Sequence, residues 1–263
     1  MSDPRSARAD VAPTADGVTF ADARERIAGI DGWLTDDQAA LLWDCASALH
    51  PGDRVVEIGS YRGRSTIVLA TAVPEGCEVV AVDPHAGTDR GPEEYHGKEL
   101  EAERDHFAFE ENLARAGVRD RVTYLRKWSH DAVDDIDGEI QLLYIDGAHR
   151  YQPARDDIRS YGARVAPGGT LLIHDSFSSK GVTAAILRTL TFGRRWRYVG
   201  RVGSMTEFRR SFVRPAERPA NALRQLGELG WFARNLLIKL LVLARQRDLA
   251  LRLGLPPDQQ WPH

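Results

Sequence analysis

Most telling for the fold is Asp53-Arg54-Val55-Val56-Glu57-Ile58-Gly59-Ser60-Tyr61-Arg62-Gly63, a short apolar run that ends in a turn with a glycine at each end. Val55, Val56 and Ile58 are β-branched and follow Pro51-Gly52, which predicts a buried strand. Residues 65–70 then favour a helix. This order is typical of a cofactor site, because glycine lets the backbone approach a ligand and a helix N-terminus offers free N–H groups.

The spacing of the two glycines limits which cofactor fits. A nicotinamide fingerprint requires G-x-G-x-x-G, whereas this turn reads Gly59-x-x-x-Gly63 with Glu57 two residues before it. The middle glycine is missing, so the segment is a poor nicotinamide site. These residues alone also allow an ordinary turn between a strand and a helix.

The composition predicts one α/β domain with additions at both ends, since 43% of the 263 residues are hydrophobic. The net charge of −3 provides no basic field, so we expect no nucleic-acid partner. Cys45 and Cys77 lie within apolar segments and are expected to be buried free thiols. Residues 1–16 lack the apolar core of a signal peptide, so a cytoplasmic protein is expected.

Further apolar runs alternate with helical patterns, which predicts a Rossmann-like, mostly parallel seven-stranded sheet with helices on both faces. Besides the strand within residues 53–58, the predicted strands are residues 78–83, 121–125, 140–146, 170–175, 196–202 and 205–209. Residues 167–169, Pro-Gly-Gly, predict a turn. Thr35 and Gln38 form a capping box in front of a helix over residues 39–49.

The chain divides into three predicted regions. Residues 1–18 are a flexible tail, residues 19–213 form the main domain, and residues 214–263 form a helical extension. Within the domain, residues 84–98 are polar and rich in glycine, which favours a lid loop over the site. The lid residues that carry hydrogen-bonding groups are His85, Asp89, Arg90, Glu93, Glu94 and His96.

The predicted strand ends carry acids and histidines. These are Asp83 after the second strand, Asp146 and His149 after the fourth, and His174 with Asp175 after the fifth. In parallel sheets ligands bind beyond the carboxyl ends of the strands, near the point where the strand order reverses. These residues are therefore expected to meet at one site.

The C-terminal extension is helical and apolar over residues 221–253, with arginines and a lysine interleaved. Its apolar core is too short to span a bilayer. We expect this helix to pack on its own domain or on a second subunit, which makes a homodimer the expected assembly. Contact with a membrane surface is the alternative, because interleaved basic charge suits anionic lipid.

Three pieces of this sequence resemble the class I S-adenosylmethionine-dependent methyltransferases: Glu57-Ile-Gly-Ser-Tyr-Arg-Gly-Arg-Ser, Asp83, and Tyr144-Ile-Asp-Gly-Ala-His. The similarity is closest to the metal-dependent O-methyltransferases of the catechol and macrocin (sugar) types, and it covers roughly residues 33 to 210. The resemblance implies S-adenosylmethionine (SAM) as cofactor. The residues that it assigns to the cofactor are Glu57, Gly59, Ser60, Tyr61, Gly63, Asp83, Trp128, Ser129 and Asp146.

The same resemblance implies a divalent metal and a base. Asp146, His174 and Asp175 fall on the metal ligands, and His149 falls on the general base of the catechol-type enzymes. His174 departs from the pattern, because the family usually has a carboxylate there. Oxygen ligands suit magnesium, the expected metal, whereas an imidazole favours manganese or another transition ion.

The resemblance thus predicts an O-methyltransferase that acts on a hydroxyl of a small molecule. A sugar is the favoured acceptor, because the polar lid and residues 146–151 offer many hydrogen-bonding groups and little flat apolar wall. A catechol or another phenol is the second choice. Two alternatives of other classes are a nicotinamide-binding oxidoreductase and a non-catalytic methyltransferase fold that binds partners.

Overall fold

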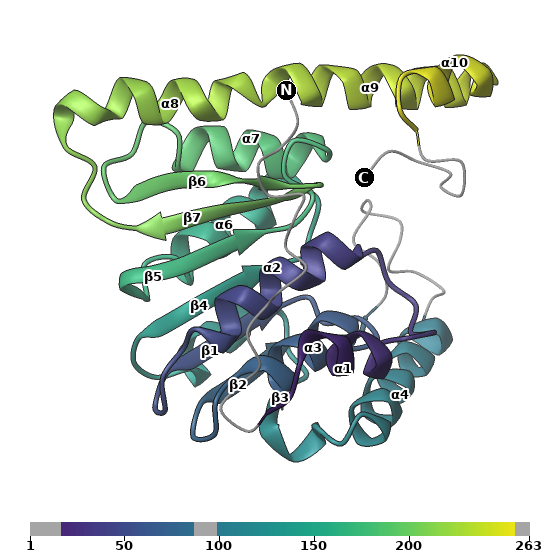
Figure 1. Ribbon diagram of the computed structural model, residues 1–263, viewed down its shortest axis with the longest axis vertical. Helices are drawn as coiled ribbons and strands as arrows, with labels where there is room; N and C mark the ends of the chain where they lie inside the picture. Colours follow the sequence, from purple (N-terminus) through teal and green to yellow (C-terminus); the bar gives the residue numbers. More distant parts are fainter. Residues whose placement is uncertain (1–16, 87–98, 256–263) are drawn as a thin grey trace.

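The computed structural model describes residues 17–86 and 99–255, and its centre is a seven-stranded sheet between two layers of helices (Figure 1). The strand order is β3-β2-β1-β4-β5-β7-β6, and only β7 runs antiparallel to its neighbours. The strands are Arg54–Ile58 (β1), Glu78–Val82 (β2), Val122–Leu125 (β3), Ile140–Ile145 (β4), Val165–Ile173 (β5), Trp196–Val202 (β6) and Met205–Arg210 (β7). The predicted α/β class and the mostly parallel seven-stranded sheet are confirmed.

The chain runs from β1 outward through β2 to β3, and then crosses to β4 on the other side of β1. The strand order reverses there, and in sheets of this kind the crevice beyond the carboxyl ends of the strands at that point is where ligands bind. The helices are Phe20–Arg26 (α1), Asp36–Ser47 (α2), Arg64–Ala72 (α3), Glu99–Arg115 (α4), Ser129–Ala132 (α5), Tyr151–Ser160 (α6), Lys180–Thr189 (α7), Arg218–Gly227 (α8), Leu229–Leu243 (α9) and Arg247–Arg252 (α10).

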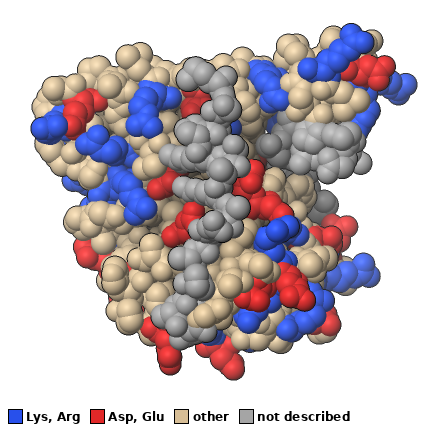
Figure 2. Space-filling view, viewed as in Figure 1, with Lys and Arg blue, Asp and Glu red and all other residues tan. Residues whose placement is uncertain are grey.

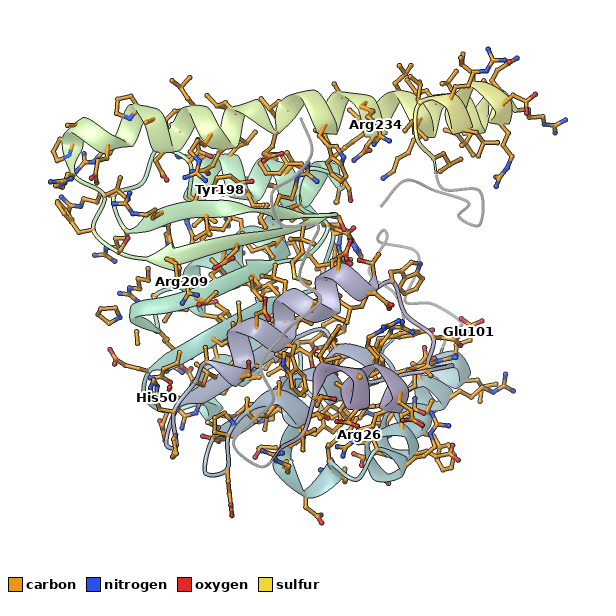
Figure 3. The ribbon with its side chains drawn as sticks, viewed as in Figure 1. Arg26, His50, Glu101, Tyr198, Arg209 and Arg234 are labelled. Atoms are coloured by element: carbon orange, nitrogen blue, oxygen red, sulfur yellow. The ribbon has the colours of Figure 1, made fainter. Side chains whose placement is uncertain are left out.

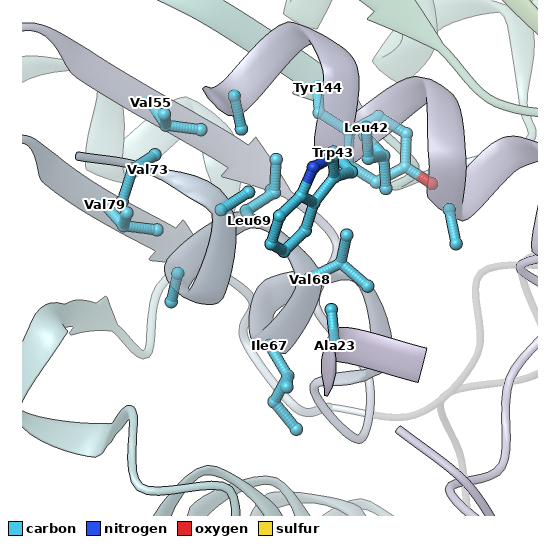
Figure 4. Close-up of a cluster of buried hydrophobic side chains, with 14 of the residues drawn as sticks. Ala23, Leu42, Trp43, Val55, Ile67, Val68, Leu69, Val73, Val79 and Tyr144 are labelled. Carbon is cyan, nitrogen blue, oxygen red and sulfur yellow. The ribbon is translucent and has the colours of Figure 1, made fainter. Parts of the chain in front are cut away.

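Alternate residues of the strands face opposite helical layers, as the period of a β-strand requires. Val55 packs with α2 and α3 around Trp43, whose side chain is fully buried (Figure 4). Val56 and Ile58 belong to the core on the other face, together with residues of α6 and α7. A strand buried on both faces explains why the run Val55–Ile58 contains almost no polar residue.

The predicted start of the fifth strand is wrong. Pro167-Gly168-Gly169 does not end a segment but lies inside β5, beside an irregularity in its pairing with β4 between Ile140 and Leu142. Proline and glycine are tolerated in a strand where it bulges, and residues 167–169 therefore continue the strand and do not form a turn. β5 therefore begins at Val165 and not at residue 170, where the predicted strand begins.

The C-terminal extension is three helices and not the single long helix predicted for residues 221–253. The first break is at Glu228, whose carboxylate accepts hydrogen bonds from Tyr198 (2.7 Å) and Arg201 (2.9 Å) of β6. Figure 3 labels Tyr198 on the side of β6 that faces these helices. The second is at Arg245, which has a left-handed backbone with φ 59°. Together α8, α9 and α10 form the outermost layer (Figure 1). None of the described helices has the length and hydropathy that crossing a membrane requires.

Candidate functional site

The turn after β1 is pressed against the turn after β4. Gly59 has φ 86°, and a Cβ atom at this position would lie 2.3 Å from the carbonyl oxygen of Asp146. At Gly63 a Cβ atom would lie 2.6 Å from Leu113 of α4. Both glycines are therefore required by close packing inside the protein. The approach at Gly59 also places the predicted cofactor turn directly beside the predicted metal ligands.

Asp83 organises the glycine turn. Its Oδ2 atom accepts hydrogen bonds from the backbone N–H groups of Ser60 and Tyr61, each at 2.9 Å. Its Oδ1 atom accepts a third, from the backbone N–H of His85 at 2.7 Å. The carboxylate at the end of β2 thus fixes the path of the chain after β1. It is already well supplied with donors, so a ribose would share it with the backbone.

His85 is not an exposed lid residue, and this prediction is wrong. The side chain is buried, and its two ring nitrogens contact the Tyr124 hydroxyl and the Tyr61 carbonyl oxygen. The Tyr124 hydroxyl in turn donates to the Asp83 carbonyl oxygen at 2.9 Å. His85 therefore stabilises the cofactor turn from behind. The other predicted lid residues lie outside the described part of the chain.

Glu57 is fully buried below the same turn. It accepts hydrogen bonds from the Ser65 and Thr66 hydroxyls at the start of α3. Burial raises the pKa of Glu57 to about 8, because the effect of lost solvent outweighs that of the two hydroxyls, which lower the pKa. The carboxyl group ties β1 to α3 and sets where the first turn of this helix begins.

One buried atom of the turn has no partner. Among the described residues, nothing hydrogen-bonds the Ser60 hydroxyl, which is shielded from solvent. In addition, no side chain caps α3 at Gly63. A buried hydroxyl without a partner is costly unless a ligand or water satisfies it. These two features fit a cofactor with polar groups over the turn.

The predicted adenine-contacting pair lies at the end of β3. Trp128 is 39% exposed, so it is not a core residue, and its ring stacks with that of His130 at 6.5 Å between centroids. Ser129 opens α5, and its carbonyl oxygen accepts a hydrogen bond from Tyr161 at 2.7 Å. In the glycine turn, the ring of Tyr61 lies 5.6 Å from that of Trp33. Aromatic rings are thus present both after β3 and at the glycine turn.

The three predicted metal ligands converge. Asp146, His174 and Asp175 each offer one ligand atom, and these atoms lie within 4.8 Å of one another. Nδ1 of His174 is 3.1 Å from an Asp146 oxygen and 3.8 Å from an Asp175 oxygen. Tyr144 also donates a hydrogen bond to Asp146 at 2.9 Å. A small cavity of about 10 Å³ borders the cluster and His149.

Gln38 determines which nitrogen of His174 carries hydrogen. Its Oε1 atom accepts a hydrogen bond from the Thr35 backbone N–H at 2.9 Å, and a backbone N–H can only donate. The same Oε1 lies 3.3 Å from Nε2 of His174, so Nε2 must be the donor there. In a neutral ring, Nδ1 is then the acceptor and points its lone pair at two carboxylates.

That arrangement requires positive charge. Nδ1 of His174 is buried and makes no well-aligned hydrogen bond with a described residue. Burial alone would lower the pKa of His174, but the charge of Asp146 and contacts with both carboxylates raise it to about 10. Either a proton on Nδ1 or a bound cation would balance the two carboxylates. An imidazole nitrogen and two carboxylate oxygens are a donor set that divalent metals accept.

His149 pairs with Asp175 beside this cluster. Burial would lower the pKa of His149, but the hydrogen bond between its Nε2 and the Asp175 carboxylate outweighs burial and raises it. The Ser178 hydroxyl donates to the other Asp175 oxygen at 3.0 Å. Burial would raise the pKa of Asp175, but its contacts with His149 and His174 hold this pKa well below the usual range. A histidine oriented by a carboxylate is the arrangement that general bases commonly have.

No role in the site was predicted for Gln38 or Tyr144, and His85 was predicted to belong to the lid. Gln38 was recognisable only as part of a capping box, a role that it also has. Tyr144 belongs to the quoted motif, but the alternation of side chains along a strand does not show that its hydroxyl contacts Asp146. For His85 the sequence was misleading, because its polar neighbours predicted an exposed loop and not a buried side chain.

Comparison with known proteins agrees with this fold. The model of a protein family described as a methyltransferase domain, Methyltransf_24, matches residues 56–176. The uncharacterized protein y4gI of Sinorhizobium fredii is 31% identical over 137 residues, which is 49% of this chain. This chain spans only 14% of the length of that curated relative.

Solved O-methyltransferase structures have the same architecture. NovP aligns with a TM-score of 0.55 and 18% identity over 76% of this chain and 91% of its own. TomG from Streptomyces achromogenes, in complex with SAM, aligns with a TM-score of 0.52 and 17% identity over 73% of this chain and 87% of its own. The Bacillus cereus O-methyltransferase, in complex with SAH, aligns with a TM-score of 0.51 and 17% identity over 72% of this chain and 87% of its own. At identities this low, the structural similarity establishes the fold alone.

Proposed function

We propose that this chain, which carries a methyltransferase domain and has the fold of class I SAM-dependent O-methyltransferases, transfers a methyl group from SAM to a hydroxyl of a small molecule with the help of a divalent cation. The observation that carries the proposal is the convergence of Asp146, His174 and Asp175 beside the glycine turn. A cofactor over the turn and an acceptor over the three ligands would be neighbours.

For the cofactor, Ser60 and the uncapped start of α3 would hold its polar end, and Asp83 would receive the ribose hydroxyls. Trp128 and Ser129 at the end of β3 would contact the adenine. When bound, SAM supplies an activated methyl group on sulfur. What the protein has to do is position the acceptor oxygen in line with that group and exclude water.

For the metal, Asp146, Asp175 and Nδ1 of His174 would be the ligands, with magnesium or manganese as the ion. A divalent ion orients an acceptor hydroxyl and lowers its pKa. His149 Nε2 faces Asp175, so the proton of the acceptor would be taken by Nδ1 of His149. Because Gln38 accepts a hydrogen bond from Nε2 of His174, a neutral ring would present the lone pair of Nδ1 to the ion.

For the acceptor, we favour a sugar hydroxyl, because residues 146–151 are rich in hydrogen-bonding groups. His85 gives this choice no support, since it is buried, and the other predicted lid residues lie outside the described residues. A phenol is the second candidate. Trp128 and Tyr151, exposed by 39% and 38%, favour it because they provide aromatic surface near the strand ends.

Calorimetric titration with SAH, with and without magnesium or manganese, tests the proposal. We expect binding in both conditions and a separate heat for the metal that Asp146→Ala abolishes. Absence of SAH binding would contradict the methyltransferase activity, whereas SAH binding without metal binding would contradict only the metal. A panel of sugars and catechols then identifies the acceptor class, and turnover of a catechol alone would overturn the preference for sugar.

A further inference from the structure

The outward face of α9 is apolar from end to end. Leu237, Leu240 and Leu243 are 47%, 63% and 68% exposed, and Ala233 and Ala244 on the same face are exposed as well. The intervals between residues 233, 237, 240 and 244 are four, three and four, which places them on one side of a helix. A contiguous exposed apolar face on a helix marks an interaction surface.

The polar residues of α9 point the other way, into the protein. Lys239 donates a hydrogen bond to the Ser178 carbonyl oxygen at 3.0 Å. The Nδ2 atom of buried Asn235 lies 3.5 Å from the Phe177 carbonyl oxygen, to which it donates. Arg234 caps α10 through the carbonyl oxygens of Leu253 (2.7 Å) and Gly254 (2.9 Å), and Figure 3 shows it between α9 and α10. The charged residues of α9 therefore stabilise the fold and do not shield the leucines.

The exposed charge at the end of this face is basic. Arg245, Arg247 and Arg252 are exposed after the last turn of α9, and Asp248 is the single acid among residues 229–255. Figure 2 shows Lys and Arg side chains in blue, with an acidic side chain in red among them, at the upper right, where Figure 1 places α10. An apolar helix face with arginines beside it matches the interface of a membrane that contains anionic lipids.

A second copy of the chain fits the same face less well. A stable protein interface takes about 20–30 residues from each partner. The outward face of α9 comprises only Gly230, Ala233, Leu236, Leu237, Leu240, Leu243 and Ala244. The helix also lies along the outer edge of the molecule (Figure 1), so it can rest on a plane without a clash from the sheet.

We propose that the outward face of α9 docks on an anionic membrane surface, with its leucines in the apolar boundary and Arg245 and Arg252 at the lipid headgroups. This inference is independent of the proposed methyl transfer. Co-sedimentation with vesicles tests it, using an equal mixture of phosphatidylcholine and phosphatidylglycerol against phosphatidylcholine alone. We expect binding to the mixture, weaker binding to phosphatidylcholine, and a decrease as salt is raised.

Matched variants separate the two contributions. Leu237→Gln with Leu240→Gln should weaken binding about 10-fold or more, because two leucines lose their apolar contact. Phe192→Gln with Phe212→Gln is the control, since these side chains are 73% and 64% exposed elsewhere, and it should change nothing. Arg245→Gln with Arg252→Gln should weaken binding roughly 30-fold at low salt.

Two kinds of result would overturn the proposal. In the first, the wild-type protein binds both vesicle types equally well or binds neither of them. The other is a dimer in light scattering that the double leucine variant dissociates, which would assign the face to a second copy. All variants are compared by their unfolding midpoints, so that a loss of fold is recognised before binding is interpreted.

Discussion

The two halves of the crevice satisfy their polar groups in opposite ways. Around the turn after β1, Asp83 accepts three backbone N–H groups and Glu57 accepts two hydroxyls, so both carboxyl groups find hydrogen-bond partners inside the protein. After β4 and β5, two carboxylates face a histidine nitrogen that lacks a well-aligned partner. The first half is built to hold a backbone in place, and the second is built to receive positive charge.

Removing an acid should therefore have different consequences in the two halves. In the first half it should loosen a turn, while in the second it should remove a ligand and leave the fold intact. Five substitutions examine this contrast.

Asp146→Ala should have the largest effect. It deletes one of two carboxylates around Nδ1 of His174, so we expect metal binding to disappear and turnover to fall by on the order of 10³-fold or more. SAH affinity, measured by calorimetry, should stay nearly intact. Wild-type activity that is unchanged in chelator would contradict the metal assignment, whatever this variant does.

His149→Ala should lower kcat by about 10²–10⁴-fold, the usual contribution of a general base. KM and the metal affinity should change little, because His149 touches the cluster only through Asp175. His149→Gln is the matched control, since an amide can donate to Asp175 but cannot take up a proton. If both variants keep the wild-type rate, His149 is not the base.

Gln38→Leu should weaken metal affinity about 10–100-fold, as the loss of a group that orients a ligand commonly does. The side chain fixes the tautomer of His174 from α2, so the effect should appear in a manganese titration of the resting protein. Ser204→Ala removes the other partner of Gln38, at 3.1 Å, and leaves its Oε1 in place. Equal losses in both variants would indicate a packing defect.

Asp83→Asn belongs to the other half, and its pattern should be reversed. An amide cannot accept from all three backbone N–H groups, so we expect a loss of about 1–3 kcal/mol in the free energy of unfolding. SAH affinity should fall about 10-fold, since one lost hydrogen bond to a charged group costs that much. Metal affinity should not change. A variant that loses only metal would contradict the division into two halves.

The same contrast explains what the sequence could predict. The β-branched runs and strand-end acids predicted the sheet and brought Asp146, His174 and Asp175 together, because parallel strands end at a common edge. Gln38 could not be found in this way. It reaches His174 across 136 positions of sequence through a capping box that exists for a local reason.

The wrong predictions have different physical causes. Buried partners draw His85 beneath the turn although its sequence neighbours are polar, so a few distant hydrogen bonds overrule the local signal. The break between α8 and α9 does have a local signal, because Gly227 ends α8 and Gly230 follows in the first turn of α9. The apolar pattern, which continues through that point, concealed it.

Glu57→Gln should have the smallest effect on the site and a distinct effect on pH dependence. The folded state raises the pKa of Glu57 from 4.5 to about 8, so between these values it binds more protons than the unfolded state. Stability contributed by this group is then present at low pH and falls as pH rises, by at most about 1.4 kcal/mol per pH unit. Denaturant titrations across this interval should show a flatter profile for Glu57→Gln than for the wild type. Glu78→Gln, in which the replaced side chain is 44% exposed, should keep the wild-type profile. If Glu57→Gln keeps the wild-type slope, the carboxyl group is not the buried proton acceptor that ties β1 to α3.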